Sequence, residues 1–167
     1  MARFVSIFLL LVIFSLPACS FREAPKTAVE GQLAPDFILA DVSGTKTRLS
    51  DLKGVVVLVN FWATWCPPCR AELPAFEQVY RSQRDKGLVV VGVDVAESPD
   101  EVAKFVVEAG LTFPIALDAS GETTELYRIQ GMPTTFFVGR DGLIKDMVIG
   151  GPLTQAAIES RVAELMK

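Results

Sequence analysis

The chain has 167 residues, of which 50% are apolar and 22% charged, so it is neither disordered nor collagen-like and fits one compact domain. The 16 basic and 20 acidic residues give a net charge of −4, and no dense basic cluster indicates a nucleic-acid-binding surface. Histidine is absent, which excludes Ser–His and Cys–His catalysis, histidine-ligated metals and covalent haem attachment.

An apolar segment follows the first three residues. It covers residues 4–16, interrupted by Ser6 and Ser15, and as a helix it would be roughly 20 Å long, too short for the roughly 30 Å hydrocarbon core of a bilayer. A basic residue, a short apolar run and then small residues are typical of an export signal, with an uncleaved N-terminal anchor as the alternative. We therefore expect residues 1–18 to be a signal peptide.

The tetrapeptide Leu16-Pro17-Ala18-Cys19 resembles a bacterial lipobox, in which the cysteine after the cleavage site receives a lipid. Lipidation of Cys19 would leave the other two cysteines as one pair, whereas an odd free thiol in an exported protein is prone to unwanted pairing. Because residues 20–32 lack periodicity, residues 19–33 are expected to form a lipid-anchored tether at a membrane surface. The folded domain is expected over residues 34–167.

Strand-like and helix-like segments alternate along the folded part. Residues 37–39 and 47–49 flank a turn and predict a hairpin, and the apolar runs 55–61 and 88–95 predict strands buried on both faces. The other elements expected are a helix over 67–84, a helix beginning at Ser98, a strand over 115–117, a helix over 122–127, strands over 135–138 and 144–149, and a helix over 154–165. This order predicts an α/β sandwich, with a mixed sheet covered by helices on both faces.

A cysteine pair lies where a predicted buried strand passes into a predicted helix. Cys66 is expected at the helix N-terminus, where free amide donors and the helix dipole stabilise a thiolate. Pro67 and Pro68 fit a first helical turn, and the two-residue spacer lets the sulfurs of Cys66 and Cys69 close a small, reducible ring. A redox-active dithiol is favoured over half a zinc site, which lacks its second ligand pair, and over an inert disulfide, whose small loop would stabilise little.

Residues 61–69, Phe-Trp-Ala-Thr-Trp-Cys-Pro-Pro-Cys, resemble the active-site segment of thioredoxin-fold proteins. Together with Ala34-Pro35-Asp36-Phe37, Arg70-Ala71-Glu72-Leu73-Pro74 and Gly131-Met132-Pro133-Thr134-Thr135, they are similar to the extracytoplasmic TlpA/ResA/CcmG-type thiol-disulfide oxidoreductases. The resemblance covers nearly all of the chain after residue 33. It implies a thioredoxin-like sandwich with an N-terminal β-hairpin and a central strand–helix insertion over residues 88–110.

The resemblance also implies roles for the two cysteines and for a proline. Cys66 would be the attacking thiolate and Cys69 the resolving thiol, because the exposed sulfur captures a substrate disulfide and the buried one releases the product. Pro133 would be a cis-proline opposite the dithiol, and Met132 would present a backbone edge to the substrate; a trans-proline turn is the alternative.

The substrate surface is expected around the dithiol. Trp65 would shield the cysteines and offer an apolar platform, next to Pro67 and Pro68 of the spacer, whereas Trp62 would belong to the core. Asp94 and Glu97 follow the strand of the central insertion, near the rim of the site. Solvated loop acids are the favoured interpretation of these two residues, ahead of a role in substrate choice.

Glu72 lies one helical turn after Cys69. In the ResA-like branch an acid at this position tunes cysteine protonation and exchanges a proton, which implies a catalytic Glu72; an ordinary exposed acid of the first turns is the alternative. Asn60 occupies the position where cytoplasmic-type thioredoxins carry a buried Asp. Proton handling is therefore expected to depend on Glu72.

The resemblance implies an exported protein disulfide reductase, anchored by lipid to a membrane and acting in the periplasm or extracytoplasmic space as a monomer without cofactor or metal. Its expected partners are disulfide-containing proteins, with apocytochrome c and cytochrome c maturation as the candidate, and a membrane thiol donor of the DsbD/CcdA type. No nucleic acid is expected. The motif leaves the direction of electron flow open.

Two other functions fit the sequence less well. A peroxiredoxin-type thiol peroxidase shares the Ala-Pro-Asp-Phe opening, but the positions where peroxiredoxins carry Thr and Pro hold Ala63 and Val59 here. A copper- or haem-handling module is disfavoured by the absence of histidine and of a methionine-rich cluster.

Overall fold

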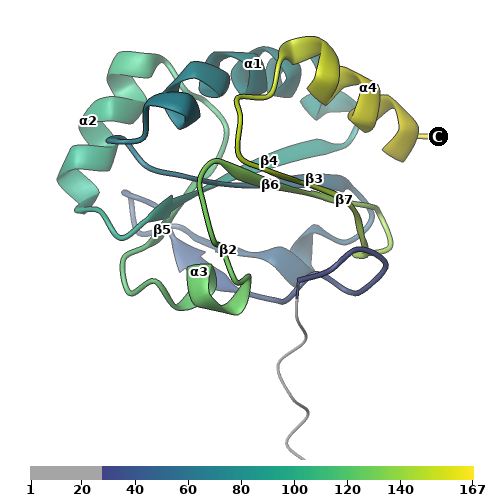
Figure 1. The fold of residues 1–167 in the computed structure, drawn as a ribbon, viewed down its shortest axis with the longest axis horizontal. Coiled ribbons are helices and arrows are strands. Elements are labelled where there is room, and N and C mark those ends of the chain that lie inside the picture. Colours follow the sequence, from purple (N-terminus) through teal and green to yellow (C-terminus); the bar gives the residue numbers. More distant parts are fainter. Residues whose placement is uncertain (1–27) are drawn as a thin grey trace, which may run out of the picture.

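The computed structural model describes residues 28–167, and a five-stranded sheet lies at the centre of the fold (Figure 1). The expected signal peptide, Cys19 and tether residues up to 27 lie outside the described residues. In chain order the elements are β1 (Ile38–Ala40), β2 (Lys46–Arg48), η1 (Leu49–Leu52), β3 (Val56–Trp62), α1 (Pro67–Gln83), η2 (Arg84–Lys86), β4 (Leu88–Val95), α2 (Pro99–Ala109), β5 (Ile115–Asp118), α3 (Glu122–Leu126), β6 (Thr134–Val138), β7 (Ile144–Ile149) and α4 (Gln155–Leu165). Among these residues, no helix is long and apolar enough to cross a membrane.

The main sheet is mixed, as the sequence predicts, and its strand order is β5-β4-β3-β6-β7. The strands β3, β4 and β5 run parallel, whereas β6 is antiparallel to β3 and β7 is antiparallel to β6. The central strand β3 is buried at all seven positions, which explains its uninterrupted apolar sequence. Its C-terminal end leads directly into the cysteine pair.

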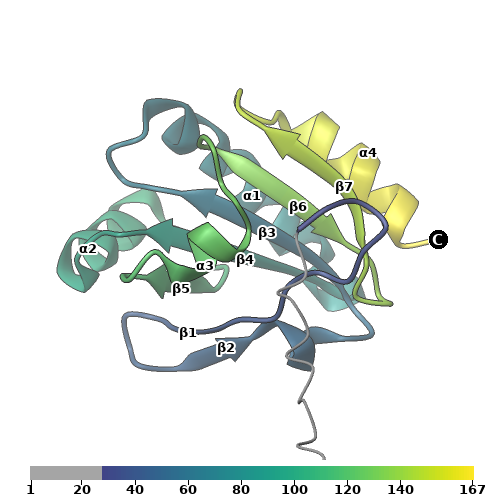
Figure 2. The same ribbon diagram turned by 60° about the horizontal axis from the view of Figure 1, so that its bottom comes forward.

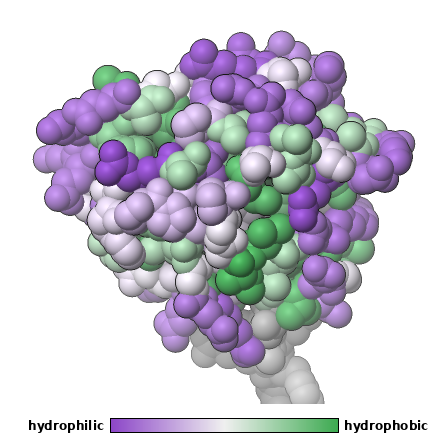
Figure 3. Space-filling model, turned by 45° about the horizontal axis from the view of Figure 1, so that its top comes forward, coloured by the Kyte–Doolittle hydropathy of each residue, from purple (hydrophilic) through white to green (hydrophobic). Residues whose placement is uncertain are grey.

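Helices α1, α2 and α4 cover one face of the sheet, and the β1–β2 hairpin and α3 cover the other (Figures 1 and 2). On one face, the core contains residues from α1, α2 and α4, including Phe76, Val102 and Ile158. On the other face, it contains Phe37 beside the β1–β2 hairpin and Tyr127 after α3. In the view of Figure 3, hydrophilic residues cover much of the surface, and hydrophobic residues form a band down its middle with smaller areas elsewhere. The amphipathic helices thus bury their apolar faces and expose their polar ones.

The domain begins earlier than the boundary expected before Ala34. Ala28 is buried, and Leu33 forms a β-bridge with Leu143. The backbone N–H of Gly31 donates to the carbonyl oxygen of Ile144, and the N–H of Ile144 donates to Gln32. Short-range periodicity cannot reveal such pairing, because the partner strand lies more than 100 residues away in the sequence.

Candidate active site

A tight turn connects the end of β3 to α1 and carries the first cysteine. The N–H of Cys66 donates to the carbonyl oxygen of Ala63, and Cys66 is the N-cap of α1, its Sγ accepting from the N–H of Cys69 at 3.3 Å. Pro67 and Pro68 fill the first two helical positions, where a missing amide proton costs little. The sulfur of Cys66 therefore lies at the positive end of the helix dipole, in an environment that favours a thiolate.

The two cysteines form a disulfide, with their Cα atoms 5.3 Å apart. The exposed fraction is 4% for Cys66 and 0% for Cys69. Cys66 is thus more exposed than Cys69, as expected, but the difference is small, and Cys66 itself is largely buried in the oxidised protein. Cys66 instead reaches the solvent through a groove.

That groove has a volume of about 300 Å³ and is lined by Cys66, Trp65, Met132 and neighbouring apolar and polar residues from β4, α3 and the loop before β6, namely Val95, Thr124, Ile129, Gln130 and Gly131. Trp65 is 65% exposed, whereas Trp62 is fully buried, as predicted, and its ring packs on Phe105 of α2. The structure thus brings two of the expected substrate-contacting residues, Trp65 and Met132, next to Cys66.

The expected proline positions lie at different depths. The Met132–Pro133 peptide bond is cis, as predicted, and Pro133 is buried. Pro67 is exposed and Pro68 half-buried, and neither is among the residues that line the groove. Among Pro67, Pro68, Met132 and Pro133, only Met132 lines the groove.

Glu72 is buried inside the protein, with 1% of its surface exposed, so the exposed-acid alternative is wrong. Its Oε1 accepts from Nδ2 of Asn60 at 2.7 Å, and its Oε2 accepts from the N–H of Leu153 at 2.8 Å. Burial raises the pKa of Glu72 to about 7, and these two hydrogen bonds oppose the increase. A carboxyl group that titrates near neutrality therefore lies one helical turn from Cys69.

Asp94 is also buried, with 1% of its surface exposed, so its interpretation as a solvated acid is wrong. The reason is its place in the sheet: Asp94 is paired with Trp62 on the central strand and with Leu117 on β5, beneath the helix layer. Glu97 is half-buried rather than free in solution, because it binds the backbone and hydroxyl of Thr64. Both acids therefore lie in the structure that supports the active-site turn, and neither is a free surface group.

Several contacts at this site have no signal in the sequence. The carboxyl of Glu72 is held from β3 by Asn60 and from the loop before α4 by Leu153, and Asn60 also donates to Thr135 Oγ1 of β6 at 2.9 Å. Sequence spacing can place Glu72 near Cys69 on one helix, but it cannot show which strand or loop supplies the partners.

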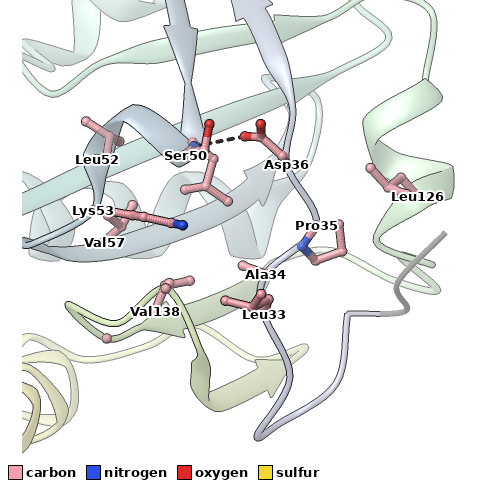
Figure 4. Close-up of a pocket in the computed structure, with 13 residues that line it drawn as sticks. Leu33, Ala34, Pro35, Asp36, Ser50, Leu52, Lys53, Val57, Leu126 and Val138 are labelled. Carbon is pink, nitrogen blue, oxygen red and sulfur yellow. Dashed lines mark hydrogen bonds between the residues drawn. The ribbon is translucent and has the colours of Figure 1, made fainter. Parts of the chain in front are cut away.

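A second cavity in the described part of the chain lies away from the cysteines, beside the N-terminal segment and η1 (Figure 4). It has a volume of about 410 Å³ and is lined by the Ala34-Pro35-Asp36 segment, Leu52, Lys53 and Val57, among others. Asp36 accepts from the N–H of Ser50 there, and Tyr127 donates to the carbonyl oxygen of Pro35. Because neither cysteine lines this cavity, these contacts serve to dock the N-terminal segment, and the chemistry belongs to the groove.

No metal site accompanies the dithiol in residues 28–167: no three His, Cys, Asp or Glu side chains are grouped to hold an ion. The arrangement consists of a helix-capping sulfur, a sealed second sulfur and a buried carboxyl group. Such a set of groups can accept and release a disulfide bond, with a proton acceptor close to the second thiol.

Comparison with known proteins gives a consistent result. Residues 30–147 match the AhpC/TSA family. The thiol-disulfide oxidoreductase ResA of Geobacillus kaustophilus strain HTA426 is 39% identical over 141 residues, which cover 84% of this chain and 80% of that protein. Among solved structures, a Chlorobium tepidum protein assigned as the thiol:disulfide interchange protein DsbE has a TM-score of 0.78 at 33% identity, covering 83% of this chain and 99% of that one. StoA from Bacillus subtilis has a TM-score of 0.66 at 31% identity, covering 80% and 98%.

Proposed function

Since the chain belongs to the AhpC/TSA family, and within it to the ResA-type thiol-disulfide oxidoreductases, we propose that it reduces protein disulfides outside the cytoplasm. The observation that carries this proposal is the placement of the two sulfurs. Cys66 caps α1 and borders the groove, while Cys69 is completely buried behind it. The two thiols can therefore take different roles.

In the proposed reaction the Cys66 thiolate attacks one sulfur of a substrate disulfide. A Cys66–substrate disulfide forms, the substrate S–S bond breaks, and one substrate thiolate leaves. Cys69 then attacks Sγ of Cys66, which closes the intramolecular disulfide and releases the second substrate thiolate. The protein dithiol supplies both electrons and is oxidised to the disulfide observed here.

Glu72 is the proposed proton acceptor for Cys69. Its pKa is raised to about 7 by burial, which matches the pH at which a thiol proton must be taken up and returned. Asn60 and the N–H of Leu153 hold both carboxyl oxygens in place. The side-chain amide of Asn60 therefore orients the carboxyl group of Glu72, and Glu72 remains the group that accepts the proton.

The groove supports an extended polypeptide as substrate. Trp65 and Met132 give it apolar walls next to Cys66, and its volume of about 300 Å³ accommodates side chains of a peptide rather than a folded surface. We propose apocytochrome c as a candidate substrate and a membrane protein of the DsbD/CcdA type as the thiol donor. In this proposal residues 1–18 are a signal peptide, residues 19–27 carry the lipid anchor on Cys19, and the domain acts as a monomer in the periplasm or extracytoplasmic space.

The reduction potential of the purified protein tests this function. The oxidised and reduced forms are equilibrated in glutathione or dithiothreitol buffers, and turnover is followed with insulin as a disulfide substrate. We expect a potential more reducing than the glutathione couple, roughly −240 mV, and catalysed insulin reduction. A potential near that of DsbA, about −120 mV, would indicate an oxidase and contradict the reductase proposal.

The peroxidase alternative receives no support from the site. Val59 and Ala63, at the positions where peroxiredoxins carry Pro and Thr, are both buried and apolar. Neither offers a hydroxyl group to a peroxide near Cys66.

A further inference from the structure

The turn that presents Cys66 is held by an acid from the central insertion. Oε2 of Glu97 accepts from the N–H of Thr64, and Oε1 accepts from the Thr64 hydroxyl, each at 2.5 Å. Thr64 lies two residues before Cys66 and next to Trp65, which lines the groove. Both oxygens of one carboxylate are thus used to fix a turn that contains no acid or base of its own.

The residue directly before Glu97 has a costly backbone conformation. Ala96 has a φ of 58°, in the left-handed region that residues other than glycine rarely occupy. Its N–H donates to the carbonyl oxygen of Asp118, and Ser98 begins α2 immediately afterwards as the N-cap. Backbone strain of this kind persists where the surrounding structure requires it, and it is concentrated at functional sites.

Asp94 lies three residues before Glu97, inside the protein. Neither of its carboxyl oxygens has a hydrogen-bond partner among the residues the structure describes. Its titratable neighbours are Glu97, in the loop that follows β4, and Asp118 on β5, and both are acids. The carboxylate of Asp118 is already satisfied by Thr123 and Thr124. The backbone N–H of Glu97 favours the charged form of Asp94, but burial and the facing Glu97 carboxylate oppose it more strongly, so the protonated form of Asp94 is favoured.

We propose that Glu97 is a positioning residue for Cys66, and that a proton on Asp94 keeps the Glu97 carboxylate on Thr64. With Asp94 neutral, one negative charge is shared by the pair and is stabilised by the two Thr64 donors. When Asp94 loses its proton, a second charge arises beside Glu97 in a buried place, and repulsion pushes Glu97 away from the turn. The active-site loop therefore loosens in alkaline solution.

This inference rests on the proposed function, because it concerns how the attacking sulfur is presented. It is independent of Glu72, whose hydrogen-bond partners are Asn60 and Leu153. Burial and the neighbouring Glu97 raise the pKa of Asp94 to about 8. The two acids therefore predict separate transitions, with that of Asp94 at the higher pH.

The amide resonance of Thr64 in the oxidised protein tests the proposal directly by NMR. The cysteines are in the disulfide and do not titrate, and no substrate is needed, so failure of the reductase function cannot mimic failure here. We expect the Thr64 resonance to follow a one-proton transition near pH 8 in the wild type and in Glu72→Gln. The transition should vanish in Asp94→Asn. Asp100→Asn, which removes an exposed acid from the same segment, serves as the matched control and should behave as the wild type.

The kinetic consequence is measured in the reduced protein, as the rate of exchange between Cys66 and a small aromatic disulfide. Glu97→Ala should lower this rate about tenfold at pH 7, because two charge-assisted hydrogen bonds to the turn are lost. Glu97→Gln, which keeps one acceptor oxygen and the side-chain length, should recover part of the rate. Asp94→Asn should retain the wild-type rate at pH 7 and exceed it above about pH 8.

A Thr64 resonance in the wild type that stays constant between about pH 6.5 and 9.5 would overturn the proposal, and this measurement requires no variant. An unchanged transition in Asp94→Asn would overturn it too, as would wild-type exchange rates in Glu97→Ala.

Discussion

Nδ2 of Asn60, on the central strand β3, donates a 2.7 Å hydrogen bond to Oε1 of Glu72, on the helix that begins at the cysteine pair. Both residues are buried. Asn60 stands at the position where cytoplasmic-type thioredoxins carry a buried Asp, and its amide orients the carboxyl group of Glu72. This pair determines how the site handles a proton next to Cys69.

Replacing Glu72 by Gln should change both the cysteine titration and the turnover. A nearby carboxylate opposes ionisation of a thiol and can accept its proton. In Glu72→Gln, pH-dependent alkylation of the reduced protein should move to lower pH, and insulin reduction should fall by roughly tenfold to a hundredfold, the range typical of losing a general base. Asp85→Asn, at an exposed acid beyond the same helix, is the control and should change neither. Superimposable titration curves for wild type and Glu72→Gln would refute the catalytic role.

The free energy of unfolding should decrease as the pH rises from 4.5 to about 7, because of Glu72. The native state holds a proton on Glu72 up to about pH 7, whereas the unfolded chain releases it near the ordinary value of 4.5. The native state binds more protons between these values, so unfolding becomes easier with increasing pH, by on the order of 2–3 kcal/mol. Urea denaturation of the oxidised protein measures this, and Glu72→Gln should flatten the curve between pH 4.5 and 7. A residual slope up to about pH 8 should remain from Asp94 and disappear in Asp94→Asn.

Changing Asn60 to Asp should produce a pH-dependent loss of stability. Two buried carboxyl groups would then meet at the position of a 2.7 Å hydrogen bond, where they can share one proton but cannot both ionise cheaply. At pH 8 we expect a loss of about 3 kcal/mol in the free energy of unfolding, and a much smaller loss at pH 5. Asn60→Ala is the matched comparison, since it removes the hydrogen bond without adding a charge. Because that bond lowers the pKa of Glu72, Asn60→Ala should also lose more stability at pH 8 than at pH 5, but the difference should be smaller than for Asn60→Asp. Equal losses for Asn60→Asp at pH 5 and pH 8 would contradict this explanation.

The two cysteines should differ in their variants. Cys66→Ser should abolish insulin reduction, because the attacking sulfur is lost. Cys69→Ser should accumulate mixed disulfides with substrates through Cys66, because attack continues while release does not. Non-reducing electrophoresis and mass spectrometry identify the trapped species. Full turnover by Cys69→Ser would show that Cys69 is not the resolving thiol.

The proposed lipid anchor predicts that Cys19→Ser changes the fate of the protein in the cell. Without the acceptor thiol, the protein should be found unprocessed or in the soluble fraction, because acyl chains supply the attachment. Membrane fractionation and the intact mass of the isolated protein measure the outcome. Ser20→Ala is the neighbouring control and should leave both unchanged. The same mass and fractionation for Cys19→Ser and wild type would remove the lipid anchor.

The sequence by itself determined the elements around the dithiol. The apolar run of β3, Cys66 at the cap and two prolines in the first turn of α1 are local features, and each is read within a few residues of the chain. The difference between Trp62 and Trp65 was predictable for the same reason: one belongs to the strand and the other to the turn after it. The mixed character of the sheet followed from the alternation of elements, since parallel strands need long crossovers and a hairpin joins antiparallel ones, whereas the strand order came from the structure.

Only the tertiary structure decided how the acids are used. Glu72, Asp94 and Glu97 look alike in sequence, yet one is held by Asn60 and Leu153, one has no partner within residues 28–167, and one holds Thr64. Asp94 at the end of a strand would be solvated if the edge were open, but the neighbouring strands and the helix layer cover it. The pKa of a carboxyl group depends on burial and on the charges and donors that face it. Those neighbours come from distant parts of the chain, so local sequence cannot specify them.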